Sequence, residues 1–383
     1  MKSICAVQGV EAAGIKEGKY GLALVRASGT AAAVFTSNRV KGAPLILMQD
    51  RIRKGRLDGI LVNSGCSNAY TGARGLADAQ AMCRIGAECL GSDPERVGVA
   101  STGVIGRYLD LSLIRRQCGM IAPRLARSGE GETAAARAIM TTDLVEKHAL
   151  VRKRTFTVAG ICKGSGMIAP NMGTMIALLY TDARISAGQL RTALRSAVSR
   201  TFNRVVVDGD ESTSDVAFCT ATGLRGKPSS AEFASALEEC CRSLARQVAI
   251  DGEGATKLIE VRVRGAPDER SAAQVARTVA GSPLVKTAVY GQDPNWGRVI
   301  AAAGRAGVAF DPDQVSFWVG GGKMRAPMVK EGVIVADLSR AKAAMGGNQV
   351  VFELDLAAGE GEATAWGCDL TEKYVEINGR YTT

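Results

Sequence analysis

The stretch of this sequence most suited to chemistry is a glycine-rich turn that runs directly into an apolar strand. It reads KGSGMIAPNMGT from Lys163 to Thr174, and MIALLYT follows over residues 175–181. A hydroxyl group at such a junction, placed directly after Gly173, can attack the preceding carbonyl carbon and convert the peptide bond to an ester. Hydrolysis of that ester would leave Thr174 with a free α-amino group.

A threonine at a new N-terminus carries its own general base. An α-amine has an ordinary pKa of about 7.7–8.0, so an appreciable fraction is neutral near pH 7 and can accept the hydroxyl proton. The sequence has one histidine, His148, which lies among charged residues and is expected at the solvated surface. An enzyme that transfers acyl groups would therefore take its base from elsewhere. The alternative is that Gly173 and Thr174 simply begin a core strand.

The remaining candidate ligands do not predict a metal site or a redox pair. One histidine rules out a multi-histidine site, and the ten cysteines contain no C-x-x-C spacing. These cysteines are too sparse for a disulfide framework, so we expect buried, reduced thiols that pack as small hydrophobic side chains. We expect no metal and no resident cofactor.

Composition favours a soluble enzyme over a nucleic-acid-binding or membrane protein. Of the 383 residues, 46% are hydrophobic, yet no apolar run approaches the ~18 residues that cross a bilayer. The first residues resemble no secretion signal, so we expect a cytoplasmic protein. The net charge of +10 is spread over short basic clusters, and aromatic residues make up only 5%. Attraction for anionic metabolites is therefore favoured over binding of nucleic acid.

The elements that must position these residues alternate between strands and helices. Strands are predicted at 59–63, 155–161, 175–181, 204–208 and 258–264, and helices at 189–202 and 231–248. In the last strand Ile259, Val261 and Val263 share one face, and the alternating charged residues Glu260, Arg262 and Arg264 share the other. This mixture predicts an α/β fold of the mixed α+β kind, with antiparallel sheet content.

Further motifs occur in a fixed order along essentially the whole chain. They are NSGCSNAYTG (63–72), ASTGVIG (100–106), IMTTD (139–143), FNRVVVDGDESTSD (202–215), DGEGATK (251–257), GQDPNWGR (291–298) and NGRYTT (378–383). Together with KGSGMIAPNMGTM they closely resemble the ornithine acetyltransferase family, the glutamate N-acetyltransferases of arginine biosynthesis.

The resemblance implies a self-cleaving architecture of the N-terminal-nucleophile type, with two domains around a central active-site cleft. Cleavage between Gly173 and Thr174 would give an α fragment, 1–173, and a β fragment, 174–383, with two copies of each in a heterotetramer. In that family the threonine takes an acetyl group from N-acetylornithine and passes it to glutamate. Some members also accept acetyl-CoA, and no residue of this sequence decides whether this chain does. Neither nucleic acid nor a membrane is an implied partner.

The resemblance also implies the catalytic residues. Thr174 is the nucleophile and its amine the base, while Thr102 and Gly103 match an oxyanion-hole pair, a hydroxyl and a backbone N–H. Without the resemblance, Ser-Thr-Gly at 101–103 would be read as a simple turn. Gly173 stands where the family most often has alanine, which leaves the cleavage rate open.

Six positions carry over as substrate contacts. They are Thr141, Lys163, Thr174, Glu253, Asn378 and Thr383. Lys163 would hold an α-carboxylate and Glu253 the δ-ammonium of ornithine, although Glu253 alone would be read as a solvated loop acid. Thr142 is an alternative to Thr141 as the threonine that contacts the substrate.

Two other functions remain as alternatives. The second hypothesis is an aminopeptidase or amidase of the related self-cleaving architecture, in which water replaces glutamate as acceptor. The third, ranked far behind, is a basic module that binds nucleic acid.

Overall fold

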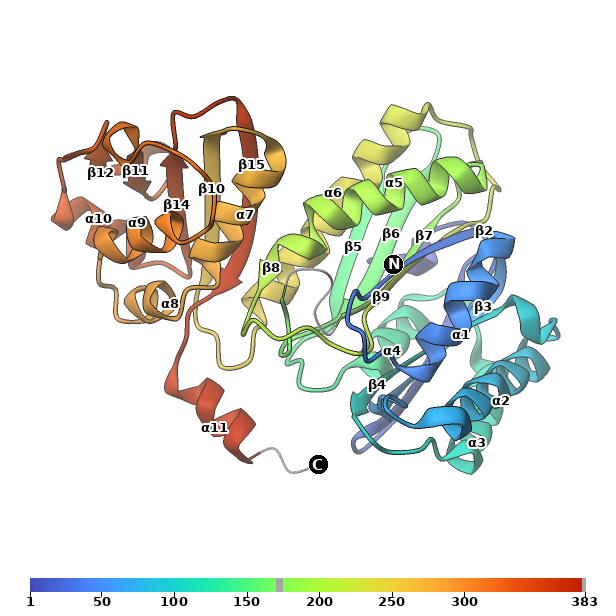
Figure 1. Ribbon diagram of the computed structural model, residues 1–383. Helices are drawn as coiled ribbons and strands as arrows, with labels where there is room; N and C mark the ends of the chain where they lie inside the picture. Colours follow the sequence, from blue (N-terminus) through green and yellow to red (C-terminus); the bar gives the residue numbers. More distant parts are fainter. Residues whose placement is uncertain (170–174, 381–383) are drawn as a thin grey trace. The chain divides into compact units, whose positions relative to one another are not determined.

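The computed structural model describes residues 1–169 and 175–380, which form two compact units (Figure 1). Unit 1 consists of Met1–Gly164, Asn171–Phe202 and Glu211–Leu244, and unit 2 of Ser165–Pro170, Asn203–Asp210 and Ala245–Thr383. The units are interleaved along the chain. The expected fragments 1–173 and 174–383 are defined by a cut in the backbone and not by these units. That cut stays a prediction.

Unit 1 is built on a mixed sheet whose described strands run in the order β4-β3-β2-β9-β7-β6-β5, with β1 paired to β2. The strands are β1 Glu11–Glu17, β2 Tyr20–Phe35, β3 Arg56–Cys66, β4 Val97–Val104, β5 Lys147–Arg152, β6 Thr157–Lys163, β7 Ile176–Thr181 and β9 Val216–Ala221. Only two neighbouring pairs are parallel, β3 with β4 and β7 with β9. The remaining described pairs are antiparallel, as the sequence predicts.

Helices cover this sheet and bury its apolar side chains. They are α1 Ala43–Arg51, α2 Gly72–Leu90, α3 Leu111–Ile121, α4 Gly129–Ile139 and α5 Ala187–Arg200, while α6 Ser230–Ile250 begins in unit 1 and ends in unit 2. Helix α5 runs across one face of the sheet (Figure 1) and begins with a capping box of Ser186 and Gln189. Every residue of β7 is buried, so the strand that follows the candidate nucleophile is fixed in the core.

Unit 2 has its own sheet, with described strands in the order β13-β12-β11-β14-β10-β15-β8. The strands are β8 Val205–Val206, β10 Leu258–Ala266, β11 Ser316–Val319, β12 Ala326–Lys330, β13 Val333–Ile334, β14 Gln349–Asp355 and β15 Gly361–Cys368. The helices are α7 Glu269–Ala280, α8 Pro283–Tyr290, α9 Trp296–Gly304, α10 Leu338–Met345 and α11 Glu372–Arg380. Helix α7 packs on β10 and β15 over a separate core of alanine and valine side chains.

Most sequence-based elements are confirmed. The predicted strands at 59–63, 155–161, 175–181 and 258–264 are β3, β6, β7 and β10, and the predicted helices are α5 and α6. The strand predicted at 204–208 is shorter in the structure, where β8 has only two residues. It ends early because Asp208 turns its carboxylate onto the backbone N–H groups of Met167 and Ile168.

The prediction for the lone histidine is wrong, and the one for the cysteines is confirmed. His148 lies half-buried on β5, with Nδ1 2.8 Å from Ser3 Oγ, and burial lowers its pKa below the ordinary value. Nine of the ten cysteines are buried, and Cys89 is partly exposed.

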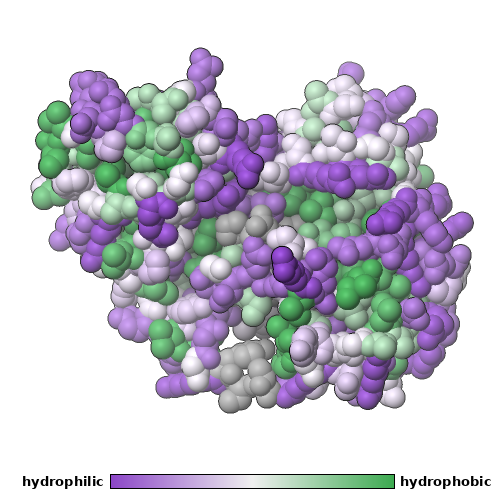
Figure 2. All heavy atoms as spheres, viewed as in Figure 1, coloured by the Kyte–Doolittle hydropathy of each residue, from purple (hydrophilic) through white to green (hydrophobic). Residues whose placement is uncertain are grey.

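The visible face of the molecule is mostly hydrophilic, with apolar side chains interspersed in small groups (Figure 2). Among the described helices, none combines the length and apolar character needed to cross a membrane.

Candidate active site

The predicted oxyanion pair lies where two parallel strands of unit 1 meet at their carboxyl ends. Thr102 of β4 pairs with Ser64 of β3, and Gly103 pairs with Gly65, next to an irregularity in the ladder. Gly103 has a φ of +130°, and a Cβ there would come within 2.4 Å of the Gly65 carbonyl carbon. Only glycine allows this close approach of the two backbones.

The Thr102 hydroxyl is buried and meets no hydrogen-bond partner among the described residues. Leaving a buried polar group unpaired costs about 1–3 kcal/mol, which makes the hydroxyl available to a ligand oxygen. The same is true of Ser101 Oγ, a feature that the sequence analysis missed. Successive side chains of a strand point to opposite faces, so only one of these two hydroxyls can serve a given ligand.

A buried carboxylate, Asp143, organises the region of Lys163 and Thr141. Its Oδ1 accepts hydrogen bonds from Lys147 Nζ at 2.8 Å and from the Gly164 N–H at 2.6 Å. Its Oδ2 accepts from the Thr141 N–H at 3.0 Å and lies 4.0 Å from Lys163 Nζ. One side chain therefore connects the 141–143 turn to the end of β6. The sequence analysis had quoted Asp143 within a motif but gave it no role.

The charges around Asp143 explain its ionisation. Burial alone would raise the pKa of this carboxyl, but the ammonium groups of Lys163 and Lys147 and the Gly164 N–H hold the pKa well below its usual range. Asp143 is therefore a carboxylate at neutral pH. Two lysines that are themselves buried, Lys147 and Lys163, thus face this one carboxylate.

A third lysine, Lys16 near the end of β1, reaches the same region. Its Nζ donates to Ser64 Oγ at 2.8 Å and to the Met140 carbonyl at 2.5 Å. Ser64 is the strand partner of Thr102, and Met140 directly precedes Thr141. The sequence offered no signal for Lys16, because these contacts join segments distant along the chain.

The strand that begins after the candidate nucleophile is held by a second buried acid. Asp215 Oδ1 accepts the Met175 N–H at 2.7 Å, and the Asp215 carbonyl accepts the Thr36 N–H at 3.0 Å. Burial raises the pKa of Asp215 well above its ordinary value and outweighs the opposing effects of the Met175 N–H and Lys163. Met175, directly before β7, is thus held by a buried carboxyl whose pKa lies well above its ordinary value. Gly173 and Thr174 themselves lie outside the described residues.

Unit 2 brings together two of the predicted substrate contacts. Asn378 of α11 donates from Nδ2 to Glu253 Oε2 at 2.7 Å. The Glu253 N–H donates to the Ser165 carbonyl at 3.0 Å, so the loop carrying this acid is anchored by its backbone. Glu253 is half-buried rather than fully solvated. Thr383, the last predicted contact, lies outside the described residues.

The structure thus places the described candidates in three groups. Thr102 and Gly103 are adjacent on β4, and the Asp143 carboxylate links Thr141 to Lys163 in unit 1. Glu253 and Asn378 are hydrogen-bonded in unit 2. The Thr141 backbone contact does not decide between the side chains of Thr141 and Thr142. The roles of all these residues stay predictions.

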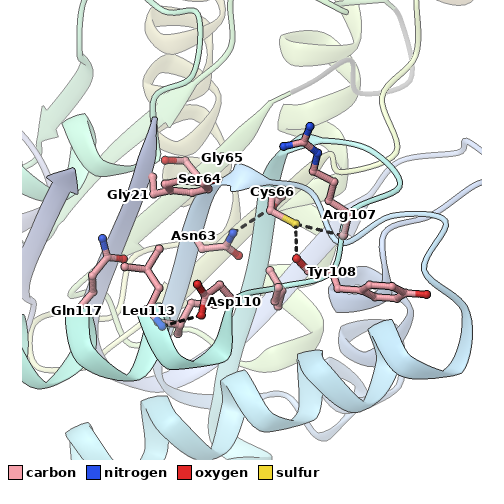
Figure 3. A pocket seen from close by; sticks show the side chains of 13 residues that line it. Gly21, Asn63, Ser64, Gly65, Cys66, Arg107, Tyr108, Asp110, Leu113 and Gln117 are labelled. Atoms are coloured by element: carbon pink, nitrogen blue, oxygen red, sulfur yellow. Dashed lines mark hydrogen bonds between the residues drawn. The ribbon is translucent and has the colours of Figure 1, made fainter. Parts of the chain in front are cut away.

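A small cavity of about 140 Å³ lies in unit 1 beside the end of β3 (Figure 3). Asn63 Nδ2 donates to the Cys66 carbonyl at 2.9 Å, and the Cys66 thiol donates to the carbonyls of Arg107 and Tyr108. Burial raises the pKa of this thiol, so it stays protonated. The volume is below the roughly 300–1,000 Å³ of a typical ligand pocket, and we assign it no substrate.

Within the described parts of the chain, no cluster of three or more His, Cys, Asp or Glu side chains is arranged to hold a metal ion.

A mixed α/β chain that positions an unpaired buried hydroxyl beside a close approach of two strands, and buried lysines around one carboxylate, has the features of an enzyme. Comparison with known proteins shows the family to which it belongs. The model of the ArgJ family matches residues 7–383, and this chain therefore belongs to the ArgJ family. The family predicted from the sequence motifs is confirmed.

Several relatives are similar over their whole length. A Methanosarcina mazei protein named glutamate N-acetyltransferase is 49% identical over 388 residues, which cover 99% of this chain and 98% of that protein. An Archaeoglobus fulgidus protein named arginine biosynthesis bifunctional protein ArgJ is 45% identical and covers 99% of this chain and 100% of its own. A crystal structure of the bifunctional protein from Bacillus halodurans is 41% identical over 52% of this chain and 96% of that chain, with a TM-score of 0.49.

We predict that Asp143→Asn strongly destabilises the protein. The substitution leaves the buried ammonium groups of Lys147 and Lys163 without their shared carboxylate, and breaking a buried pair in this way costs about 3–5 kcal/mol. Urea denaturation measures the free energy of unfolding. Glu95→Gln is the control, because the Glu95 side chain is itself exposed, and removing its ion pairs with Arg51 and Lys54 should cost less than about 1 kcal/mol. Equal losses in the two variants would contradict this account of Asp143.

Asp215→Asn should change how stability depends on pH. A carboxyl whose pKa rises on folding binds more protons in the folded state, so the free energy of unfolding falls as pH rises, by at most about 1.4 kcal/mol per unit. The amide of the variant still accepts the Met175 N–H but cannot ionise. Its advantage over the wild type should therefore grow between about pH 5 and pH 8. Melting temperatures measured across this range should diverge, and parallel curves would show that Asp215 is not buried in neutral form.

Proposed function

We propose that this protein is a glutamate N-acetyltransferase that moves an acetyl group from N-acetylornithine to glutamate through an acetyl-threonine intermediate on Thr174. The observation that carries the proposal is membership of the ArgJ family over nearly the whole chain, with relatives of that name at 45–49% identity. The buried, unpaired hydroxyl of Thr102 and the lysines around Asp143 supply groups that such a reaction needs.

The proposed reaction begins with cleavage between Gly173 and Thr174. The Thr174 hydroxyl then attacks the acetyl carbonyl of N-acetylornithine while its α-amine takes up the hydroxyl proton. The Thr102 hydroxyl and the Gly103 N–H stabilise the negative charge that develops on the carbonyl oxygen. The carbon–nitrogen bond breaks, the proton passes to the departing amine, and ornithine leaves an acetyl ester on Thr174.

Glutamate completes the cycle by the reverse route. Its neutral α-amine attacks the ester, the Thr174 oxygen regains a proton, and N-acetylglutamate departs. Lys163 binds the α-carboxylate common to both substrates, and Glu253, held by Asn378, binds the ornithine ammonium. Thr141 and Thr383 complete the substrate contacts.

The proposal extends to the assembly and its setting. Fragments 1–173 and 174–383 stay together as a heterotetramer with two copies of each, in the cytoplasm. The proposed reaction uses only the chain's own groups and needs no metal or cofactor. Acetyl-CoA is a second donor to test, because some members of the family use it.

Thr174→Ala should yield a single uncut chain with no acetyl transfer, because the variant lacks the hydroxyl that begins both steps. Intact-mass spectrometry of the purified protein reports the cut. Thr133→Ala, which removes a hydroxyl hydrogen-bonded within α4, is the control and should be cut like the wild type. Two fragments from the Thr174→Ala variant would rule out this cleavage mechanism.

Thr102→Val should slow the reaction without weakening the fold. Loss of one oxyanion donor lowers kcat by about 10²–10³, whereas removing an unpaired buried hydroxyl should leave the melting temperature unchanged or higher. Ser101→Ala is the matched control, since it removes the neighbouring unpaired hydroxyl and should leave kcat near the wild-type value. A comparable loss of kcat in both variants would contradict the role of Thr102. Ornithine release with and without glutamate completes the test, because release independent of glutamate would indicate a hydrolase.

A further inference from the structure

Gly166 of unit 2 makes a contact with Glu253 that no residue with a side chain would allow. A Cβ at this position would lie 2.3 Å from Glu253 Cδ and 2.4 Å from each of the two carboxylate oxygens. Real Cβ atoms essentially never come within 3.0 Å of another such atom. The carboxylate of Glu253, a predicted substrate contact, therefore lies directly against the backbone of Gly166.

Backbone conformation does not explain why position 166 is glycine. The φ of Gly166 lies outside the range from +20° to +160° that side chains rarely adopt, so alanine could take the same conformation. The next residue, Met167, has a φ of +54° and carries a side chain nonetheless. Its N–H donates to Asp208 at 2.6 Å. Position 166 therefore requires glycine for the space that the Glu253 carboxylate occupies, not for conformational freedom.

The main chain around Glu253 is held in place, so its side chain is the part that would have to move. The Glu253 N–H donates to the Ser165 carbonyl at 3.0 Å, and the Ser165 hydroxyl donates to the Asp251 carbonyl at 2.6 Å. After Glu253, the Gly254 carbonyl accepts the Thr371 hydroxyl at 2.7 Å. A Cβ at position 166 would therefore push the carboxylate away by about 1 Å, from 2.4 Å to the 3.4 Å of an ordinary contact.

The Glu253 carboxylate is suited to an ammonium group from outside the chain. It belongs to a half-buried residue, and Asn378 Nδ2 donates to one of its oxygens at 2.7 Å. In the part of the chain that the structure describes, no lysine or arginine nitrogen comes within 4.0 Å of it. A carboxylate with one amide donor keeps acceptor sites for an ammonium group. Where this acid can meet such a group depends on the space at Gly166.

We infer that Gly166 is a positioning residue for donor selection. By leaving room for the Glu253 carboxylate, it holds this acid where it binds the terminal ammonium group of N-acetylornithine. The inference rests on the proposed function, in which Glu253 binds that group, and deepens it by adding a residue that acts through Glu253.

The alternative is a purely structural role, in which Gly166 only fits a crowded turn. The two roles differ in what a side chain at this position would change. A structural role would affect every donor alike. The positioning role affects a donor that carries an ammonium group far more than one that lacks it.

The test compares two donors in the full-length enzyme, with glutamate as acceptor. N-acetylnorvaline has the carbon chain of N-acetylornithine without its ammonium group. The wild type should favour N-acetylornithine about 10- to 100-fold in kcat/KM, the usual effect of a hydrogen bond between charged groups. Gly166→Ala should lower this preference about 10-fold or more, mostly through KM for N-acetylornithine. Gly188→Ala is the matched control, because a Cβ there meets no atom within 4 Å, and it should keep the wild-type preference.

A second pair of variants shows whether Gly166 acts through Glu253. Glu253→Ala removes the carboxylate and should by itself abolish the donor preference. Adding Gly166→Ala to Glu253→Ala should then change neither donor's kcat/KM, because the new Cβ meets no carboxylate. This comparison decides the matter even where Gly166→Ala alone folds poorly, since the double variant should recover to the level of Glu253→Ala.

Three outcomes separate this inference from the function on which it rests. An unchanged donor preference in Gly166→Ala, or a further loss when it is added to Glu253→Ala, would overturn the role of Gly166 and leave the acetyltransferase intact. Full preference for N-acetylornithine in Glu253→Ala would show that the contact proposed for Glu253 is wrong, and this inference with it. A wild type that acetylates glutamate from neither donor would overturn the acetyltransferase itself.

Discussion

The buried carboxylate of Asp143 is the interaction on which the candidate site of unit 1 depends. It accepts hydrogen bonds from a lysine and two backbone N–H groups and faces a second lysine, so it fixes both the 141–143 turn and the end of β6. Without it, two buried ammonium groups would be left uncompensated. With it, the ammonium groups of Lys147 and Lys163 are held beside the 141–143 turn.

Other features of unit 1 also lower the stability of the fold and leave polar groups available to a ligand. Gly103 allows a backbone approach that no side chain could tolerate, and Thr102 beside it is left with an unpaired buried hydroxyl. Asp215 is fully buried where it accepts the N–H of Met175, directly before β7, and burial raises its pKa. Each of these groups is costly in an ordinary core. Together they mark the ends of β3 and β4 and the start of β7 as places built for chemistry rather than for packing.

The regular elements were predictable because local patterns determine them. Apolar runs predicted β6 and β7, and helical spacing of apolar residues predicted α5 and α6. The alternation of apolar and charged residues predicted the apolar face of β10. The opposite face of β10 shows the limit of such patterns. Glu260, expected with the polar residues, is buried because Arg246, Arg262 and the Trp366 indole all bind its carboxylate.

The candidate site was predictable only where a motif carried it. Thr102, Lys163 and Glu253 entered through resemblance to a family, since nothing local distinguishes them from residues of ordinary turns and loops. Asp143 lay inside a recognised motif, but its role depends on Lys163, which follows 20 residues later on another strand. Lys16 gave no sequence signal at all, because its contacts on Ser64 and Met140 exist only once the sheet has formed.

The central claim is that an acetyl group passes through Thr174. The most direct measurement is the intact mass of the protein after N-acetylornithine is added, and again after glutamate follows. The account predicts that the fragment beginning at Thr174 gains one acetyl group and then loses it when glutamate arrives. Ornithine release and glutamate acetylation by a protein whose fragments never carry the acetyl group would contradict it.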